Sequence, residues 1–143
     1  MAAVANSFVA LSRDAPAGYR TLARLRAAAL MAEAGNLPGA TAQWEAVALD
    51  PEADRLYRDL ATLLSVSHAV DSGDPAALSA RLAPLLAEGN PWRASARETA
   101  ALLAIRRGAS EEARRMLEAL VSDPAAPAGI RERAQRVAAG LRG

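Results

Sequence analysis

The chain has no cysteine and no lysine, and only 3% of its residues are aromatic. Without cysteine it can form no disulfide, no thiolate nucleophile and no zinc site of the cysteine type, and its redox compartment is left undetermined. With so few aromatic residues, a core must be built from alanine and leucine. Small side chains let helices approach closely, which favours a layered helical fold over a sheet rich in β-branched residues.

Long apolar runs and an excess of one charge are also missing. The sequence has no run of about eighteen apolar residues, and its alanine-rich start lacks a basic segment, so it contains neither a membrane span nor a signal peptide. The net charge is +1, from 17 basic and 16 acidic residues, which argues against a nucleic-acid-binding face. A length of 143 residues with 52% hydrophobic content fits one domain with a continuous core.

A spacing pattern recurs after three glycines, Gly35, Gly73 and Gly108. Small or apolar residues follow each glycine at offsets five, nine and twelve, a spacing that places them on one face of an α-helix. The glycines recur at intervals of about 35 residues, the period of stacked helical hairpins. The nine positions are Ala40, Trp44, Val47, Leu78, Leu82, Leu85, Ala113, Leu117 and Leu120. We therefore expect an all-α fold, a right-handed α-solenoid of stacked hairpins with about eight helices.

The order of elements follows from this phase. Residues 1–143 form one repeat domain, in which residues 1–14 are the second helix of a hairpin without its first helix. Complete hairpins follow at 16–50, 51–89 and 91–123, and a capping helix occupies 127–142. Asp-Pro pairs close two of the hairpins, at Asp50-Pro51 and Asp123-Pro124. The capping helix should keep the open end of the stack soluble, and four arginines would serve this purpose: Arg131, Arg133, Arg136 and Arg142.

Local patterns add expectations for single residues. Tyr19 and Leu22 fall on the expected buried face of the helix that begins at Pro16. Pro51 is expected to open the next long helix, because proline suits a first helical turn. Pro84 lies inside a helical stretch and should kink it, because it cannot donate to the carbonyl of Ala80. Asp74 and Ser110 are each expected to cap the helix that follows.

The first helix has an apolar face made by Val4, Phe8 and Leu11. We call the first helix of each hairpin first-type and the second helix second-type. A second-type helix that lacks its first-type partner leaves such an apolar face without a neighbour. This predicts an upstream segment in the natural protein, a homodimer contact through these three residues, or both.

Catalytic templates are absent from the sequence. His68 is the only histidine, and general-base catalysis normally needs a second group to orient the ring, so we interpret His68 as structural or as a partner contact. The acid pair Glu111-Glu112 stands where a helix begins, where acids complement the helix dipole. No phosphate loop, nucleophile elbow or metal-binding helix motif occurs. The sequence therefore predicts a non-enzyme with no cofactor, no metal and no small-molecule substrate.

Arginine recurs near the start of each first-type helix. A cation there faces the positive end of the helix dipole, so helix stability does not select it. One interpretation is that a chain without lysine simply places its positive charge on exposed faces. The other is a basic stripe that binds acidic segments of partner proteins, with Tyr57 and Trp92 as anchors. The candidate partner-binding residues are Arg20, Arg24, Arg55, Tyr57, His68, Trp92, Arg93 and Arg97, and Arg58 and Arg131 belong to the same pattern.

Three segments carry a resemblance to a known family: Pro75-Ala-Ala-Leu-Ser-Ala-Arg-Leu-Ala-Pro84, Gly89-Asn-Pro-Trp-Arg-Ala-Ser-Ala-Arg-Glu98 and Asp123-Pro-Ala-Ala-Pro-Ala-Gly-Ile-Arg131. The general pattern resembles the tetratricopeptide repeat. These segments are similar to the tetratricopeptide-like domain of proteobacterial inner-membrane proteins related to the ancillary subunit of the SecYEG translocon. The resemblance implies a periplasmic repeat domain behind an N-terminal membrane helix, in contact with the translocon or with periplasmic folding factors.

Two functions from different classes follow. The first is a non-catalytic protein–protein interaction domain at the periplasmic face of the inner membrane, attached by a segment that this chain lacks. The second is a soluble scaffold or assembly protein that dimerises through its N-terminal helix, with a place in the cytoplasm if Met1 is the native start.

Overall fold

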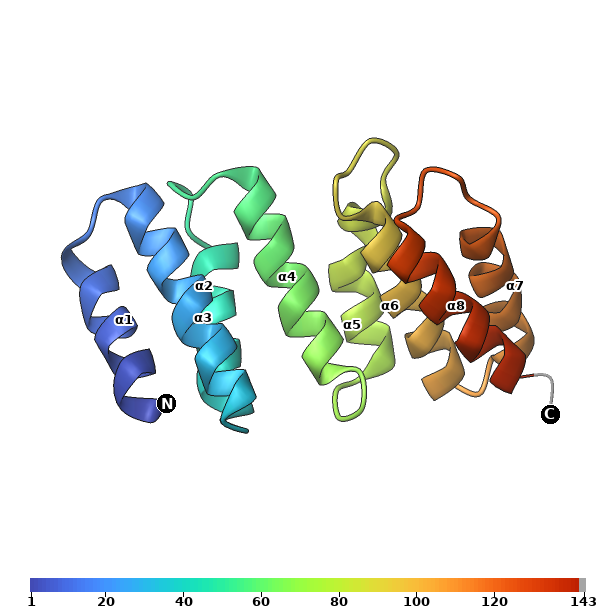
Figure 1. The fold of residues 1–143 in the computed structure, drawn as a ribbon, viewed down its shortest axis with the longest axis horizontal. Helices are drawn as coiled ribbons and strands as arrows, with labels where there is room; N and C mark the ends of the chain where they lie inside the picture. The colour runs from blue at the N-terminus through green and yellow to red at the C-terminus, as the bar shows by residue number, and fades with distance from the viewer. Residues whose placement is uncertain (142–143) are drawn as a thin grey trace. The chain divides into compact units, whose positions relative to one another are not determined.

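The computed structural model describes residues 1–141 and is all-α over that range, with eight α-helices and no strand. The helices are α1 Ala2–Asp14, α2 Ala17–Glu33, α3 Leu37–Ala48, α4 Arg55–Ala69, α5 Pro75–Leu82, α6 Arg93–Arg106, α7 Ser110–Val121 and α8 Ala128–Gly140, and a 3-10 helix, η1, spans Ala83–Leu86. Figure 1 shows them in chain order. The predicted all-α fold of repeated helical hairpins is confirmed. The expected role of Arg142 lies outside the described residues.

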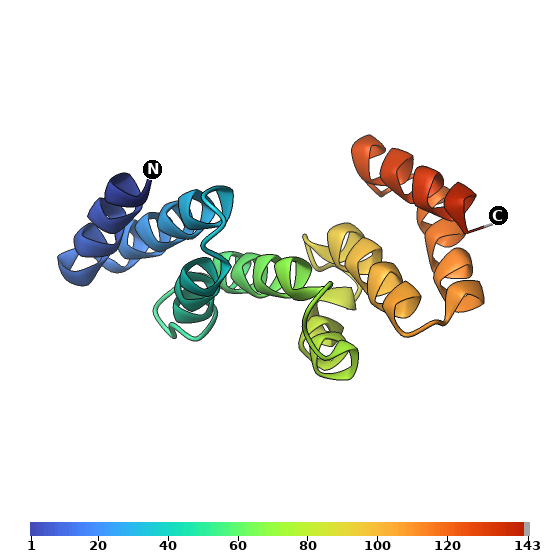
Figure 2. The same cartoon turned by 90° about the horizontal axis from the view of Figure 1, so that it is seen from below.

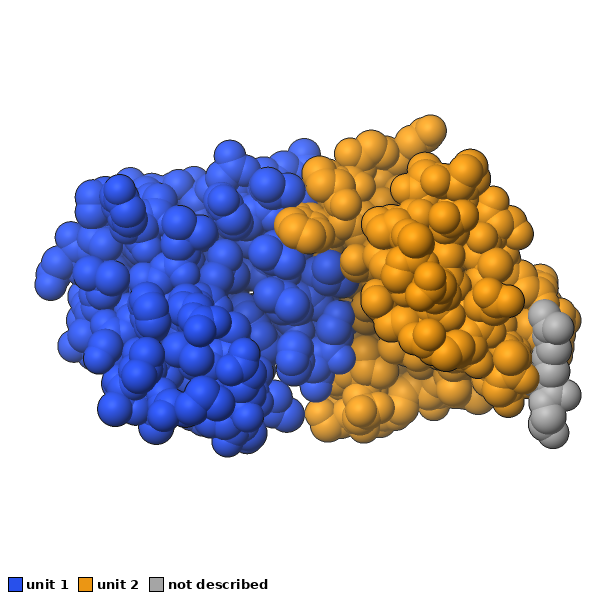
Figure 3. Space-filling view, viewed as in Figure 1, with its two compact units in different colours: residues 1–68 blue, residues 69–143 orange. Residues whose placement is uncertain are grey.

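The chain divides into two compact units, residues 1–68 (unit 1) and residues 69–143 (unit 2), which are coloured separately in Figure 3. In unit 1, α1 packs against α2 and α2 packs against α3. In unit 2, α6 packs against α5 and α7, and α7 packs against α8. Consecutive helices within a unit run in alternating directions, which Figures 1 and 2 show from two sides. Each unit is thus built of antiparallel helical hairpins.

The nine positions of the recurring pattern are all buried, with exposed fractions of 0% to 6%. The prediction of a buried stripe after each of the three glycines, in α3, in α5 with η1 and in α7, is therefore confirmed. The physical reason is the spacing of four and three residues, which keeps the side chains on one side of the helix.

Unit 1 has its core around Trp44 of α3. This side chain packs in one cluster with Ala28 of α2 and Ala61 of α4, and Val47 lies beside it. The alanines on the flanking helices leave room for the indole ring, so one large residue fills the space between three helices. Trp44 takes the place expected for it between neighbouring hairpins.

In unit 2, leucine side chains fill the space between the helices. Leu117 and Leu120 of α7 pack in one cluster with Ala101 of α6 and with Ile130 and Ala134 of α8. A second-type helix is again covered by the first-type helices on either side of it.

The buried face of α2 differs from the expectation at two residues. Tyr19 is 71% exposed and Leu22 is 50% exposed, so their predicted burial is wrong. The buried residues of α2 are Thr21, Ala23, Ala27, Ala28 and Leu30. Helix α2 packs against both α1 and α3, and small side chains permit that close approach on two sides. Large apolar residues are therefore left on its outer side.

Two helix starts were predicted wrongly. Pro51 does not open α4, because it lies in a turn and α4 begins only at Arg55. The Asp54 carboxylate, just before the helix, accepts a hydrogen bond from the Leu56 amide. Ser110 does not cap α7: the cap position is Ala109, which has no side chain for the purpose, and Ser110 is the first helical residue. The predicted cap of α5 by Asp74 is confirmed, because its carboxylate accepts from the Ala77 amide at 2.8 Å.

Pro84 ends the α-helix instead of kinking it. Helix α5 stops at Leu82, and the chain continues as the 3-10 helix η1. Proline cannot donate the hydrogen bond that an α-helix needs at this position, and the tighter winding lets the chain go on without it. Leu85 still reaches the core from η1, where it is buried.

Gly35 ends α2 in the left-handed region, with φ +78°. The Asn36 amide donates to the Met31 carbonyl and the Gly35 amide to the Ala32 carbonyl, which closes the helix end. An added Cβ at Gly35 would meet no atom within 4 Å, so only the backbone conformation would oppose a side chain there.

We predict that Gly35→Ala lowers the free energy of unfolding by about 1 to 2 kcal/mol, because a non-glycine residue is strained at positive φ. Urea denaturation followed by circular dichroism measures the change. Gly18→Ala is the matched control, because Gly18 lies within α2 and also has open space around it. It should be neutral or raise the stability by up to about 1 kcal/mol. Equal effects of the two substitutions would contradict the role of Gly35.

Candidate functional site

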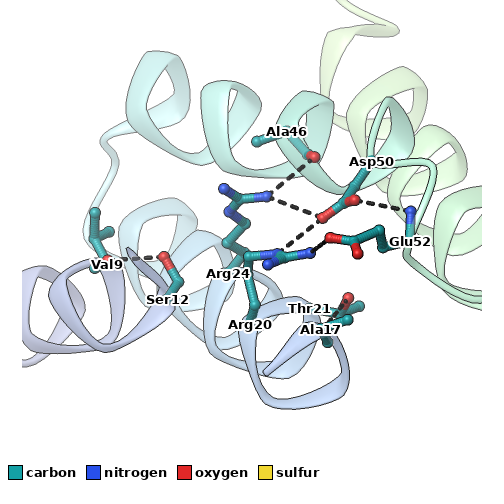
Figure 4. A network of polar contacts seen from close by, with 9 residues as sticks. All are labelled: Val9, Ser12, Ala17, Arg20, Thr21, Arg24, Ala46, Asp50 and Glu52. Atoms are coloured by element: carbon teal, nitrogen blue, oxygen red, sulfur yellow. Dashed lines mark hydrogen bonds and ion pairs between the residues drawn. The ribbon is translucent and has the colours of Figure 1, made fainter. Parts of the chain in front are cut away.

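The aspartate that closes the first complete hairpin is held by two arginines of the same hairpin. Asp50 follows α3, and its Oδ2 accepts a hydrogen bond from Arg20 Nε at 3.1 Å and from Arg24 Nη1 at 3.4 Å. Arg20 also donates to Glu52 at 2.5 Å. Figure 4 shows both guanidinium groups reaching from α2 to the turn after α3. These contacts tie the start of one helix to the end of the next.

Unit 2 repeats the arrangement at Asp123. Arg97 Nη1 of α6 donates to Asp123 Oδ2 at 2.5 Å. The separation in sequence is 26 residues for Arg97 and Asp123, as it is for Arg24 and Asp50. The other carboxylate oxygen accepts the amide two residues further on, from Glu52 at 3.0 Å and from Ala125 at 2.9 Å. We refer to Asp50 and Asp123 as the closing aspartates.

The hydrogen bonds of the closing aspartates favour their ionised form. Partial burial alone would raise the pKa of Asp50, but the Glu52 amide and Arg20 outweigh it, so that the pKa lies below its ordinary value. The Ala125 amide, followed by Arg97, likewise lowers the pKa of Asp123. The bonds to Glu52 and Asp50 in turn raise the pKa of Arg20. Both turns are therefore held by charged groups at neutral pH.

Most arginines of the predicted basic stripe form ion pairs or hydrogen bonds with groups of the same chain. Arg20, Arg24 and Arg97 bind the closing aspartates, and Arg93 Nε donates to the Leu86 carbonyl at 3.0 Å. Arg55 stays mostly exposed, with Asp59 3.7 Å away. Binding of acidic partner segments by these residues stays a prediction. Their structural role was missed at the sequence level, although the equal spacing of arginine and closing aspartate in two hairpins could have revealed it.

Three of the predicted partner-binding residues carry a ring, and two of them, Tyr57 and His68, lie in unit 1 near Trp44. Tyr57 is half-buried and packs against the Trp44 cluster. His68 is exposed, and its ring centroid lies 4.6 Å from that of Trp44. The third, Trp92, is half-buried and immediately precedes α6 of unit 2. The predicted partner-binding residues thus belong to two units and are not shown to form one site.

A shallow pocket of about 340 Å³ lies beside Trp44 and His68. Leu64 and alanines of α2 supply the rest of an apolar lining, with Glu33 at its edge. The Nδ1 atom of His68 lies 2.9 Å from the Leu64 carbonyl oxygen. Such a lining can accept an apolar side chain. Within residues 1–141 no group of three or more histidine, aspartate or glutamate side chains is placed to hold a metal ion.

Exposed large apolar side chains gather in unit 1. Across the described part of the chain they all fall within the first 56 residues: Met1, Val4, Leu11, Tyr19, Leu22, Leu37, Leu49 and Leu56. Leu11 and Tyr19 line one depression of about 380 Å³ together with Ala10, Asp14, Ala15 and Pro16, where α1 meets α2. We call Val4, Phe8, Leu11, Asp14 and Tyr19 the α1 surface. Sequence reasoning identified Val4, Phe8 and Leu11 but missed Asp14 and Tyr19.

The comparisons with known proteins add no family to these observations. No protein-family model matches the sequence, and neither a curated protein nor a solved structure does. Among the described helices, none is both long and apolar enough to cross a membrane.

The lowered pKa of Asp123 predicts a pH dependence of stability. A carboxyl group whose pKa is lower in the folded than in the unfolded chain stabilises the fold above its unfolded pKa of about 3.9. That contribution is lost as the pH falls through the lower, folded pKa. We expect Asp123→Asn to remove this part of the acid-induced loss of stability, because asparagine can still accept the Ala125 amide but cannot pair with Arg97 as an anion. Urea denaturation between pH 7 and pH 3 measures it.

Glu132→Gln provides the control for that experiment. Glu132 is an exposed acid of α8 that has no ion pair within the described residues. Its neutralisation should leave the pH profile close to that of the wild type. A profile for Asp123→Asn that matches both the wild type and this control would mean that the closing aspartate does not stabilise the hairpin electrostatically.

Proposed function

We propose that this chain is a non-catalytic protein–protein interaction domain that binds its partner through the α1 surface. One observation carries the proposal: the exposed large apolar side chains of the described residues all belong to unit 1, and two of them, Leu11 and Tyr19, line the same depression. Apolar side chains scattered singly on a surface are ordinary, whereas a shared patch is typical of an interaction site.

The chemistry of the patch suits protein binding. Tyrosine is enriched among residues that dominate interface energies, and Tyr19 stands out from α2 with most of its surface free. The surface lies on two packed helices, so that a partner would meet it already formed. A preformed surface lowers the ordering cost of association.

The surroundings of His68 support a non-catalytic role. Its Nδ1 atom faces the Leu64 carbonyl rather than a carboxylate, and its ring lies against Trp44. A general base normally needs an oriented ring beside a second titratable group. We therefore assign His68 to packing or to a partner contact.

The resemblance to the translocon-related inner-membrane family adds a proposed place of action. On that basis the partner is a translocon component or a periplasmic folding factor, and the membrane anchor is a segment outside this chain. A second candidate is the soluble scaffold that dimerises through α1. It is favoured by the exposure of Val4 and Leu11 on the same helix.

The test is site-specific photo-crosslinking in cells of the source organism. A photoreactive phenylalanine derivative replaces Tyr19 in the full-length natural protein, and the adducts are identified by mass spectrometry. We expect an adduct with a different protein, and Leu11→Glu should reduce its yield at least about fivefold, since a charge in an apolar contact must be desolvated. Leu11 is 57% exposed, so this variant should fold, which circular dichroism can check.

The same photoreactive residue at Gln135 is the matched control, because Gln135 is exposed on α8 of unit 2. No adduct at position 19, or equal yields at both positions, would contradict the proposal. An adduct between two copies of this chain would favour the scaffold instead.

A further inference from the structure

Helix α1 packs against α2 with one side and leaves a second, apolar side exposed. Ala5 and Ser12 are buried on the side that packs against α2. Val4 and Leu11 are 51% and 57% exposed. Because successive residues of an α-helix are about 100° apart, each exposed residue lies about 100° round the helix from its buried neighbour. The helix therefore carries apolar surface beyond what α2 covers.

Two other second-type helices, α3 and α7, show what packs against such a helix. Helix α3 is packed by α2, and Arg24 of α2 reaches across to the Ala46 carbonyl of α3 at 3.4 Å. Helix α7 lies against both α6 and α8. In each case an arginine-bearing helix precedes the second-type helix in the chain and lies along it. Helix α1 packs against α2, the helix that follows it.

Charge points to the same kind of neighbour. Asp14 stands at the C-terminal end of α1 and lines the depression with Leu11 and Tyr19. A carboxylate at that end meets the negative end of the helix dipole, so the helix itself does not select it. The closing aspartates stand at the ends of α3 and α7 and are bound by arginines of the preceding helix. Asp14 has no ion pair within residues 1–141.

We propose that the α1 surface is the docking site for an amphipathic α-helix of a partner protein. This helix presents an alanine and leucine face to Val4, Phe8 and Leu11, and two arginines four residues apart to Asp14. Its chemistry is that of α2 and α6 in this chain, which carry the pairs Arg20 and Arg24, and Arg93 and Arg97. The inference rests on the proposed function and names the class of its partner.

A second copy of the chain is a poorer occupant. Its helix α8 buries its apolar residues Ile130, Ala134 and Ala138 in its own core. The exposed side of α8 carries Glu132, Arg133, Gln135 and Arg136. That polar side is a poor match for the apolar Leu11, and a head-to-tail contact of this kind would build a ring or an open filament.

The test uses a labelled synthetic peptide as the partner helix. The peptide has the sequence of residues 90–107, which span α6 and include Arg93 and Arg97, with capped ends, and is titrated into the full chain while fluorescence anisotropy is recorded. We expect saturable binding that weakens about tenfold in Asp14→Arg, the loss typical of breaking one close charge pair. A peptide with Arg93 and Arg97 both replaced by aspartate should bind this variant better than it binds the wild type. Amide chemical shifts should move at positions 4, 8, 11 and 19.

Glu132→Arg makes the same charge change on α8 and should leave the affinity unchanged. The inference is overturned by an absence of saturable binding, by equal effects of the two reversals, by shifts confined to unit 2, or by a dimer in sedimentation that Leu11→Glu dissociates. If the crosslink from position 19 to a partner protein is found while the peptide fails, the proposed function stands and only this helix is wrong. If the crosslink also fails, both are wrong.

Discussion

The burial of one narrow apolar stripe on each of the helices α3, α5 and α7 is the constraint on which this structure depends. A helix as short as α3 or α7 is marginal in water, and most of its stability has to come from packing. Its stripe holds only three main residues, as with Ala113, Leu117 and Leu120 of α7, all of which are buried. Such a stripe is covered only when first-type helices lie close on both sides. Small alanines such as Ala28 and Ala134 let the helices approach closely. The repetition of hairpins follows from the need to cover each stripe in this way.

The closing aspartates explain why arginine stands near the start of α2 and α6. The positive end of the helix dipole disfavours a cation there, but a bond to a partly buried carboxylate outweighs a few tenths of a kcal/mol. Arg24 and Arg97 hold the turn after the next helix and so keep the two helices of a hairpin in register. Positive charge is thereby used within the hairpins, and the apolar α1 surface is left as the better candidate for recognition.

Local sequence chemistry predicted helix ends with mixed success. The C-terminal glycines are correct, because Gly35 and Gly108 both adopt positive φ where a helix ends. The cap by Asp74 is also correct, since a cap is a contact within one turn. Pro51, Pro84 and Ser110 were misjudged, because each suits a helix start or interior in isolation. The surrounding turn decided against them when Asp54 supplied a better start for α4 and 3-10 winding absorbed Pro84.

The sequence by itself determined the helical class, the hairpin period and the stripes that bury Trp44 and Leu117, because periodicity along a single helix is a local property. Only the tertiary structure decided that α2 buries Ala27 and Ala28 and exposes Tyr19, since the choice of face depends on which neighbours pack against it. The bond between Arg97 and Asp123 joins groups 26 residues apart, and packing alone brings them together. Asp123 is paired with Arg97, whereas Asp14 has no ion pair within residues 1–141, and this contrast likewise depends on how the helices pack.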